Sequence, residues 1–353
     1  GEYDHYLEWK DTYPIKLNTK WSSQEKLING ALTKDAIINL IRNFILFDEI
    51  GGNKVKIVGR YHQYRAVNKV VDRLQGEKTP DDRSGIVWHT QGSGKSMSMV
   101  FLIRKLRTIE NLKKFKIVIV TDRTDLEGQL KDTAGLAEKP YVMKNTKALT
   151  SELKTDTSNL VMVMAQKFLK RTQRKKSDEE LPDYEEFPVL NKSEDVLVLV
   201  DEAHRTQSGV FGDNLVISLP NSTRVAFTGT PLIAKKVKKR TYERFGKYID
   251  KYRMKESIAD GSTLRIKYEG KTVRTRIKSK KKLDVEFEDM FEDKTKDELI
   301  AIKKKYGTKG NVLESEKRIK KIAQDLVKHY FENIFDNGFK AQVVASSRIA
   351  AVR

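Results

Sequence analysis

The sequence contains no cysteine among its 353 residues. Disulfide scaffolds, cysteine-ligated zinc, iron–sulfur clusters and thiol catalysis are therefore excluded. No apolar run approaches the 18 residues of a membrane span, so we expect no membrane partner. The five histidines lack the spacing of a zinc site. The start of the chain is acidic and aromatic, unlike a signal peptide, and lacks an initial Met, which favours a fragment of an intracellular protein.

The balance of charge indicates the kind of partner. Lys and Arg together number 69 and Asp and Glu 49, which gives a formal net charge of +20. Such an excess favours a polyanionic partner, with nucleic acid as the first candidate. The net positive charge alone does not establish a polyanionic partner, because proteins that are merely soluble can carry a similar charge. The length allows about two domains.

Five short apolar runs with little alternation indicate the fold class. They lie at 85–89, 116–120, 160–164, 196–200 and 224–227. Strands formed by such runs are apolar on both faces, and both faces must be buried. This is typical of a parallel sheet with helices on each side. We therefore predict one α/β domain over residues 56–247. Apolar density also predicts a mostly buried helix over 36–47, and helical spacing predicts another over 60–75.

The composition changes near residue 235. Segments 235–255 and 271–282 are dense in Lys and Arg, and either line a duplex track or form a solvated face. An amphipathic helix is predicted over 314–335, followed by a strand over 341–345. A strand so near the end of the sequence suggests a second domain, over 248–353, that is cut short.

A glycine-rich turn carries the strongest chemical signal. It follows the run at 85–89, precedes a helical stretch (97–106), and reads Thr90-Gln91-Gly92-Ser93-Gly94-Lys95-Ser96. Its glycines let backbone N–H groups converge on phosphate oxygens, and the helix N-terminus adds positive charge. Lys95 would reach the β- and γ-phosphates, and Ser96 would ligate Mg²⁺. His89 stands where the usual first glycine belongs, so a fortuitous Gly-Ser turn is the alternative.

A pair of acids supplies the second signal. The apolar run at 196–200 ends in Asp201-Glu202-Ala203-His204. Asp201 can hold Mg²⁺ through water, and Glu202 can polarise a water that attacks the γ-phosphate. Adjacent acids at a strand end are otherwise simple caps. His204 either couples this motif to the next one or is a satisfied interior imidazole.

The third signal is Thr228-Gly229-Thr230-Pro231, directly after the run at 224–227. Small hydroxyl side chains here can hydrogen-bond to both the nucleotide site and a neighbouring domain, so Thr228 and Thr230 are candidate coupling residues. The simpler interpretation is a Gly-Pro turn.

In this order the three motifs resemble the motor core of superfamily 2 helicases, with motif I at 89–96, motif II at 201–204 and motif III at 228–230. Other runs narrow the resemblance to the restriction (motor) subunit of type I restriction–modification enzymes. They include a glutamine-motif run at 60–65, Arg205-Thr206-Gln207 after motif II, Tyr242-Glu243-Arg244-Phe245-Gly246, Ala259-Asp260-Gly261, and Ser346-Ser347-Arg348 at the position of motif IV.

The resemblance implies a set of site residues. Gln63 would read the adenine edge, and Arg123, Lys167 and Arg348 would face DNA or else be solvated surface charges. Lys95 and Glu202 would be catalytic, and Ser96 and Asp201 would hold Mg²⁺. The ATP-binding set would be Arg60, Gln63, His89, Thr90, Gln91, Gly92, Ser93, Gly94, Lys95 and Ser96.

The resemblance also implies an architecture. We expect a RecA-like P-loop lobe over 56–247 with a parallel sheet flanked by helices, and a truncated second RecA-like lobe over 248–353 that ends at motif IV. Residues 1–55 would be a helical connector that follows a nuclease domain missing here. Motifs V and VI, with the family's arginine finger, are not found in the sequence, so we expect weak or no ATP hydrolysis.

The function implied is ATP- and Mg²⁺-dependent translocation on double-stranded DNA, in the cytoplasm of a bacterium or archaeon, beside methyltransferase and specificity subunits. Two alternatives stay open. One is another superfamily 2 DNA or RNA helicase, which a preference for single strands would favour. The other is a nucleotide-gated DNA-binding module without turnover, which the missing motifs favour.

Overall fold

The computed structural model describes residues 7–50, 52–121, 139–168, 170–171, 184–185, 187–203, 210–231, 241–266, 268–271, 316–345 and 347–352. The chain divides into two compact units, Gly1–Arg265 and Ile266–Arg353. Within the described ranges, none of the helices has both the length and the apolarity needed to cross a membrane.

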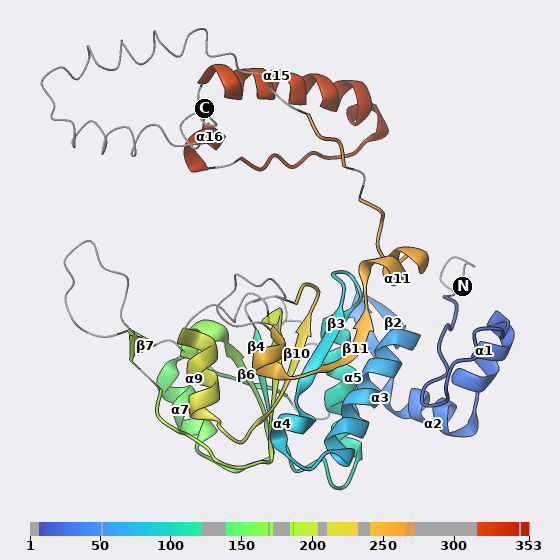
Figure 1. The fold of residues 1–353 in the computed structure, drawn as a ribbon, viewed down its shortest axis with the longest axis vertical. Helices are drawn as coiled ribbons and strands as arrows, with labels where there is room; N and C mark the ends of the chain where they lie inside the picture. The colour runs from blue at the N-terminus through green and yellow to red at the C-terminus, as the bar shows by residue number, and fades with distance from the viewer. Residues whose placement is uncertain are drawn as a thin grey trace, which may run out of the picture. The chain divides into compact units, whose positions relative to one another are not determined.

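The first unit is built on a parallel sheet of seven strands in the order β11-β3-β10-β9-β4-β6-β5 (Figure 1). All five predicted runs form strands of this sheet, so the α/β fold class is confirmed. The strands are β3 (Gly85–His89), β4 (Lys116–Thr121), β5 (Tyr141–Val142), β6 (Leu160–Met164), β9 (Val196–Asp201), β10 (Thr223–Thr228) and β11 (Tyr248–Tyr252).

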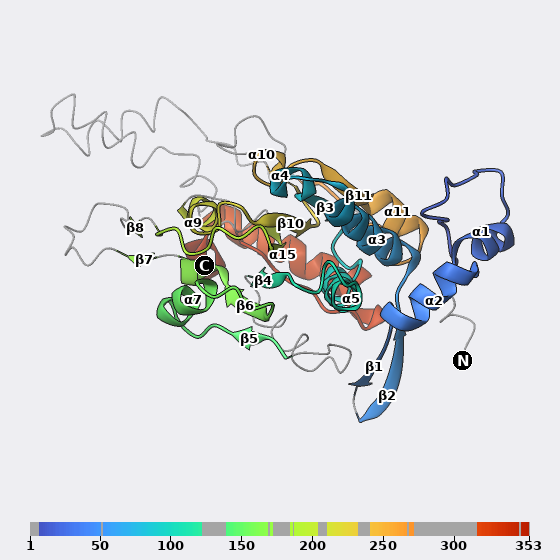
Figure 2. The ribbon, with the colours of Figure 1, turned by 90° about the horizontal axis from the view of Figure 1, so that it is seen from below.

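Both faces of the sheet are buried, as the continuous apolar runs require. Successive residues of β4 enter different cores: Ile117 and Ile119 pack on the side of α3 (Tyr61–Gly76) and α5 (Lys95–Thr108), and Val118 and Val120 pack on the opposite side. That opposite core includes α7 (Thr146–Leu153) and α9 (Val210–Ser218). Figures 1 and 2 show the two helix layers on either side of the strands. Side-chain alternation along a strand produces this division.

The N-terminal region differs from the helical connector that we expected. Helix α1 (Ser23–Gly30) and α2 (Lys34–Asn43) are followed by an antiparallel hairpin, β1 (Ile45–Ile50) with β2 (Asn53–Val58). The predicted helix over 36–47 therefore ends at Asn43, because the next apolar residues pair as a strand. It is also not mostly buried: Ile38 and Ile41 are exposed, and only one face of α2 packs inward.

The first unit extends beyond residue 247, where we had expected the second domain to begin. Strand β11 pairs in parallel with β3 and is followed by α11 (Met254–Ala259), so both belong to the first unit. The pairing has a simple cause: β3 would otherwise be an edge strand with unpaired backbone groups. The other elements in the described part of this unit are α4 (Pro80–Arg83), η2 (Ala165–Phe168), β7 (Lys170–Arg171), β8 (Tyr184–Glu185) and α10 (Thr241–Phe245).

The described part of the second unit is helical. It contains α15 (Glu316–Asn333), which confirms the predicted amphipathic helix, then η3 (Phe335–Asn337) and α16 (Arg348–Val352). The predicted strand over 341–345 is wrong, since these residues form no ladder with any described strand and Val344 is exposed. An extended segment needs a partner for its backbone groups before it becomes a strand.

The contact between β3 and β11 gives a first prediction. A Cβ on Gly85 would lie 2.4 Å from Ile249 Cγ1 and 2.8 Å from the Lys247 carbonyl oxygen. We expect Gly85→Ala to lower the free energy of unfolding by about 1–3 kcal/mol, as overpacking does. Denaturant titration would measure it. Gly76→Ala is the matched control, because a Cβ there meets nothing within 4 Å. Equal stability of the two variants would contradict the prediction.

Candidate nucleotide-binding site

Three neighbouring strands deliver the three motifs to one edge of the sheet. Strands β3, β10 and β9 lie side by side and run parallel, so their C-terminal ends open onto the same edge. The loops that follow them carry motif I, motif III and motif II respectively. Ligands of open α/β sheets bind at the carboxyl ends of the strands.

The loop after β3 has the backbone shape of a phosphate cradle. Gly92 and Gly94 adopt φ angles of +82° and +76°, in the left-handed region that favours glycine. The Ser93 hydroxyl donates to the Thr90 carbonyl at 2.6 Å and closes the turn. Helix α5 then starts at Lys95, so its first N–H groups, which lack intrahelical partners, lie at the loop. The predicted P-loop conformation fits a triphosphate.

Motif II meets motif I through a charge contact. Lys95 Nζ lies 3.5 Å from Glu202 Oε1 and 3.5 Å from the Thr90 carbonyl, and the two side chains are only 8% and 6% exposed. Asp201 is buried beside them and accepts from the Thr121 hydroxyl at 3.5 Å. Glu202 has a φ of +45°, which a non-glycine residue rarely adopts and which often marks a functional position.

Motif III packs against the phosphate loop. A Cβ on Gly229 would lie 3.1 Å from the Gln91 nitrogen and 3.5 Å from Lys95 Nζ, so the absence of a side chain permits the contact. Trp88 Nε1 donates to the Gly229 carbonyl at 3.0 Å. Thr228 is buried, whereas Thr230 is exposed and its backbone N–H donates to the Thr228 hydroxyl. The structure thus brings all three motifs together.

The glutamine-motif run lies directly behind the loop. Gln63 accepts from the Arg60 backbone N–H at 2.8 Å and donates to the Gly94 carbonyl at 3.0 Å. It therefore ties the start of α3 to the phosphate loop, and its reading of adenine stays a prediction. His62 adds a second tie, with its Nε2 3.0 Å from the Ser93 carbonyl. Arg60 itself donates to the Ser262 hydroxyl at 2.6 Å.

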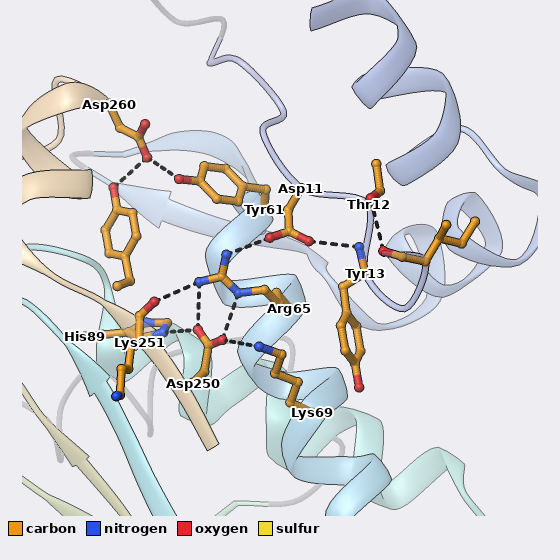
Figure 3. A network of polar contacts seen from close by, with 12 residues as sticks. Asp11, Thr12, Tyr13, Tyr61, Arg65, Lys69, His89, Asp250, Lys251 and Asp260 are labelled. Atoms are coloured by element: carbon orange, nitrogen blue, oxygen red, sulfur yellow. Dashed lines mark hydrogen bonds and ion pairs between the residues drawn. The ribbon is translucent and has the colours of Figure 1, made fainter. Parts of the chain in front are cut away.

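The His89 side chain lies in the interior, and its place in the ATP-binding set stays a prediction. Its imidazole is fully buried, with Nε2 2.8 Å from Asp250 Oδ2 (Figure 3). Burial lowers the pKa of His89 despite the nearby carboxylate, so Nε2–H of a neutral ring donates. The His89 side chain therefore ties β3 to β11.

Asp250 is the centre of a polar cluster that the sequence did not reveal. Arg65 donates to both its carboxylate oxygens at 2.8 and 2.9 Å, and Lys69 donates at 2.8 Å (Figure 3). Burial alone would raise the pKa of Asp250, but the hydrogen bonds from His89 and Arg65 and the Arg65 charge more than offset it and hold the pKa well below its ordinary value. The Tyr252 carbonyl of β11 also accepts a hydrogen bond from the Thr90 backbone N–H.

The other predicted site residues lie as follows. Ser96 is partly exposed in the first turn of α5, and its role as a Mg²⁺ ligand stays a prediction. Lys167 is partly exposed in η2. Arg348 is exposed at the start of α16 in the second unit. His204 and Arg123 lie outside the described residues. No described group of three or more His, Asp or Glu side chains forms a separate metal cluster.

Comparison with known proteins identifies the family of the chain. The model of the SWI2/SNF2 ATPase family matches residues 62–300. The chain belongs to this family. It is 32% identical over 346 residues to the type I restriction enzyme HindI endonuclease subunit of Haemophilus influenzae, with 92% of this chain and 31% of that protein aligned. It is 30% identical to the putative MjaIXP endonuclease subunit of Methanocaldococcus jannaschii, with 94% of this chain and 31% of that protein aligned.

The chain therefore spans about a third of the length of these curated relatives. One aligned solved structure is a nuclease-deletion mutant of the Type ISP restriction–modification enzyme LlaGI in complex with a DNA substrate mimic. The alignment has a TM-score of 0.38 and 16% identity, and covers 58% of this chain and 20% of that one.

The buried histidine behind the loop gives a pH prediction. Burial lowers the pKa of His62 to about 4, although its contact with the Ser93 carbonyl acts in the opposite direction. The unfolded chain binds a proton near the ordinary value of 6.5, and the folded chain binds it only near 4, so stability falls as pH drops through this window. The loss from this group reaches about 3 kcal/mol.

We expect His62→Gln to flatten the fall in melting temperature between pH 6.5 and 4, because an amide does not titrate but still donates to the Ser93 carbonyl. Thermal unfolding at a series of pH values measures this. His329→Gln, which removes a partly exposed histidine from α15, is the matched control. An unchanged acid slope in His62→Gln would show that other groups cause it.

Proposed function

We propose that this chain is the ATP-driven, double-stranded DNA translocating part of a type I restriction endonuclease subunit. The observation that carries the proposal is the 3.5 Å contact between Lys95 Nζ and Glu202 Oε1, with Gly229 against the same loop. Membership of the SWI2/SNF2 ATPase family and the two restriction-subunit relatives support it.

The residues suggest how hydrolysis would proceed. ATP phosphates would lie on the backbone of 91–95 and compete with Glu202 for the Lys95 ammonium. Glu202, released from that pairing, would then accept a proton from the water that attacks the γ-phosphate. Ser96 and, through water, Asp201 would hold Mg²⁺, which neutralises phosphate charge. Lys95 would stabilise the charge that develops on the phosphate oxygens.

Coupling of this chemistry to DNA is the second part of the proposal. Thr228 and Thr230, and His204 after motif II, would transmit the state of the nucleotide site to the DNA contacts. Arg123, Lys167 and Arg348 are the proposed DNA-facing side chains. The net charge of +20 supports sequence-independent contact with phosphates.

Sequence specificity and methylation would come from separate specificity and methyltransferase subunits. The organisms of the two relatives, a bacterium and an archaeon, support action in a prokaryotic cytoplasm.

The phosphate site can be tested in the chain itself. We expect Lys95→Ala to abolish the rise in melting temperature that Mg-ATP gives the wild type, because the ammonium that pairs with the phosphates is lost. We expect Glu202→Gln to retain that rise and to remove the weak hydrolysis of the wild type, in line with the loss of a general base. Calorimetry of unfolding and phosphate release measure the two effects.

Exposed residues of the same types provide controls for these variants. Lys113 and Glu110 pair with each other at the surface, so Lys113→Ala and Glu110→Gln should behave as the wild type does in both assays. If Lys95→Ala keeps the full nucleotide-dependent shift, the assignment of the phosphate site is wrong.

The DNA preference separates the proposed motor from its alternatives. Since motifs V and VI are not found in the sequence, we expect only weak ATP hydrolysis from this chain, lower by about 10³–10⁵ for want of an arginine finger. Any stimulation should be greater with duplex DNA than with single strands at matched salt. A preference for single-stranded DNA or RNA would favour another superfamily 2 helicase. Robust duplex stimulation would contradict the expected weakness.

A further inference from the structure

The turn after α11, residues 260–263, lies against the phosphate loop, although it belongs to none of the three motifs. The Thr263 hydroxyl donates to the Gln91 carbonyl at 3.5 Å, across a separation of 172 residues in the sequence. A Cβ on Gly92 would lie 3.8 Å from Thr263 Oγ1 and 3.9 Å from the Ser262 carbonyl oxygen. The turn therefore touches the loop at the first of its two left-handed glycines.

The backbone N–H groups of the loop are aimed by whatever holds the preceding carbonyls. A trans peptide unit is planar, so its C=O and N–H groups point in opposite directions. His62 Nε2 lies 3.0 Å from the Ser93 carbonyl, and this contact also sets the direction of the Gly94 N–H. Gln63 donates to the Gly94 carbonyl at 3.0 Å and so sets the direction of the Lys95 N–H. Both of these donors come from α3.

Thr263 is the corresponding donor for the Gly92 N–H, which shares a peptide unit with the Gln91 carbonyl. Within the described ranges, no other group donates to this carbonyl. Ser257 Oγ lies 2.5 Å from Thr263 Oγ1. Because a carbonyl can only accept, Thr263 gives its proton to Gln91 and accepts from the fully buried Ser257. Hydrogen bonds in such a chain strengthen one another.

The turn that carries Thr263 is itself held in place. Asp260 accepts from the Tyr61 hydroxyl at 2.6 Å (Figure 3) and from the Tyr252 hydroxyl at 2.8 Å. Lys10 Nζ lies 2.6 Å from its other oxygen. Burial alone would raise the pKa of Asp260, but these three donors hold the pKa below its ordinary value. A residue positions another group well only when its own surroundings are fixed.

We propose that Thr263 is a positioning residue for phosphate binding, whose hydroxyl holds the Gln91–Gly92 peptide so that the Gly92 N–H points into the phosphate cradle. The inference rests on the proposed function for the presence of phosphates on the loop. Thr263 acts through Gly92 and is not itself a phosphate ligand. At 3.5 Å its hydrogen bond is long, so we expect a moderate effect when the bond is lost.

Removal of the hydroxyl tests this role. Thr263→Val loses the donor and keeps a side chain of similar shape. We expect it to weaken Mg-ATP and magnesium tripolyphosphate equally, by about threefold to tenfold, because the two ligands share the phosphates. Thr263→Ser keeps a hydroxyl and should bind both ligands within about twofold of the wild type. Titration calorimetry gives the dissociation constants, and the melting temperatures without ligand should be alike in the two variants.

Thr150→Val is the matched control. Thr150 is also partly exposed, and its hydroxyl donates to the Thr146 carbonyl of α7 at 2.8 Å. The inference is overturned if Thr263→Val binds both ligands as the wild type does, if Thr150→Val weakens them equally, or if Thr263→Ser is as weak as Thr263→Val. Weakening of ATP without tripolyphosphate would also overturn it.

Lys95→Ala distinguishes a failure of this inference from a failure of the proposed function. If Lys95→Ala loses both ligands while Thr263→Val keeps wild-type affinity, the phosphate site stands and the role of Thr263 is rejected. If Lys95→Ala still binds tripolyphosphate as the wild type does, the phosphate site is rejected and the role of Thr263 is rejected with it.

Discussion

The parallel pairing of β3, β10 and β9 is the constraint on which the site depends. Parallel neighbours end at the same edge of a sheet, so residues more than a hundred positions apart in the sequence arrive within a few ångströms. Lys95 and Glu202 meet in this way, and Gly229 lies between their loops with no side chain in the way. The contact is a charge pair between two side chains that are only 8% and 6% exposed, and electrostatic interactions are stronger in such a place than in water.

A second buried carboxylate, that of Asp250, explains how the phosphate loop is held in position from behind. Asp250 would be costly to bury alone, and three cationic or N–H donors from α3 and β3 offset that cost. The result is that β11, β3 and the start of α3 are fastened to one another behind Gly92 and Gly94. A loop whose supports are this closely bonded keeps its backbone N–H groups in one fixed arrangement.

The sequence was sufficient for the parts of the fold and site that depend on local patterns. Apolar runs without alternation identified five strands of the sheet, and glycines followed by Lys95 identified the loop, because both signals are contiguous. It was insufficient for β11, because Tyr-Ile-Asp-Lys-Tyr is not a continuous apolar run and contains the buried Asp250. A carboxylate is buried only where distant donors such as Arg65 reach it, and no local pattern records that. The contact of His89 with Asp250 was missed for the same reason, since its partner is 161 residues away.

The polar cluster around Asp250 also links the N-terminal segment, residues 7–11, to the strand that precedes the phosphate loop. Arg65 is shared between Asp11 and Asp250, so the guanidinium that holds the segment also fixes the residue bonded to His89 at the end of β3. Release of Asp11 would leave Arg65 with one carboxylate, and an alternative position of Arg65 would alter the donors around Asp250. The position of the segment and the support of the loop therefore share one guanidinium, whose charge is costly to leave unpaired in the interior.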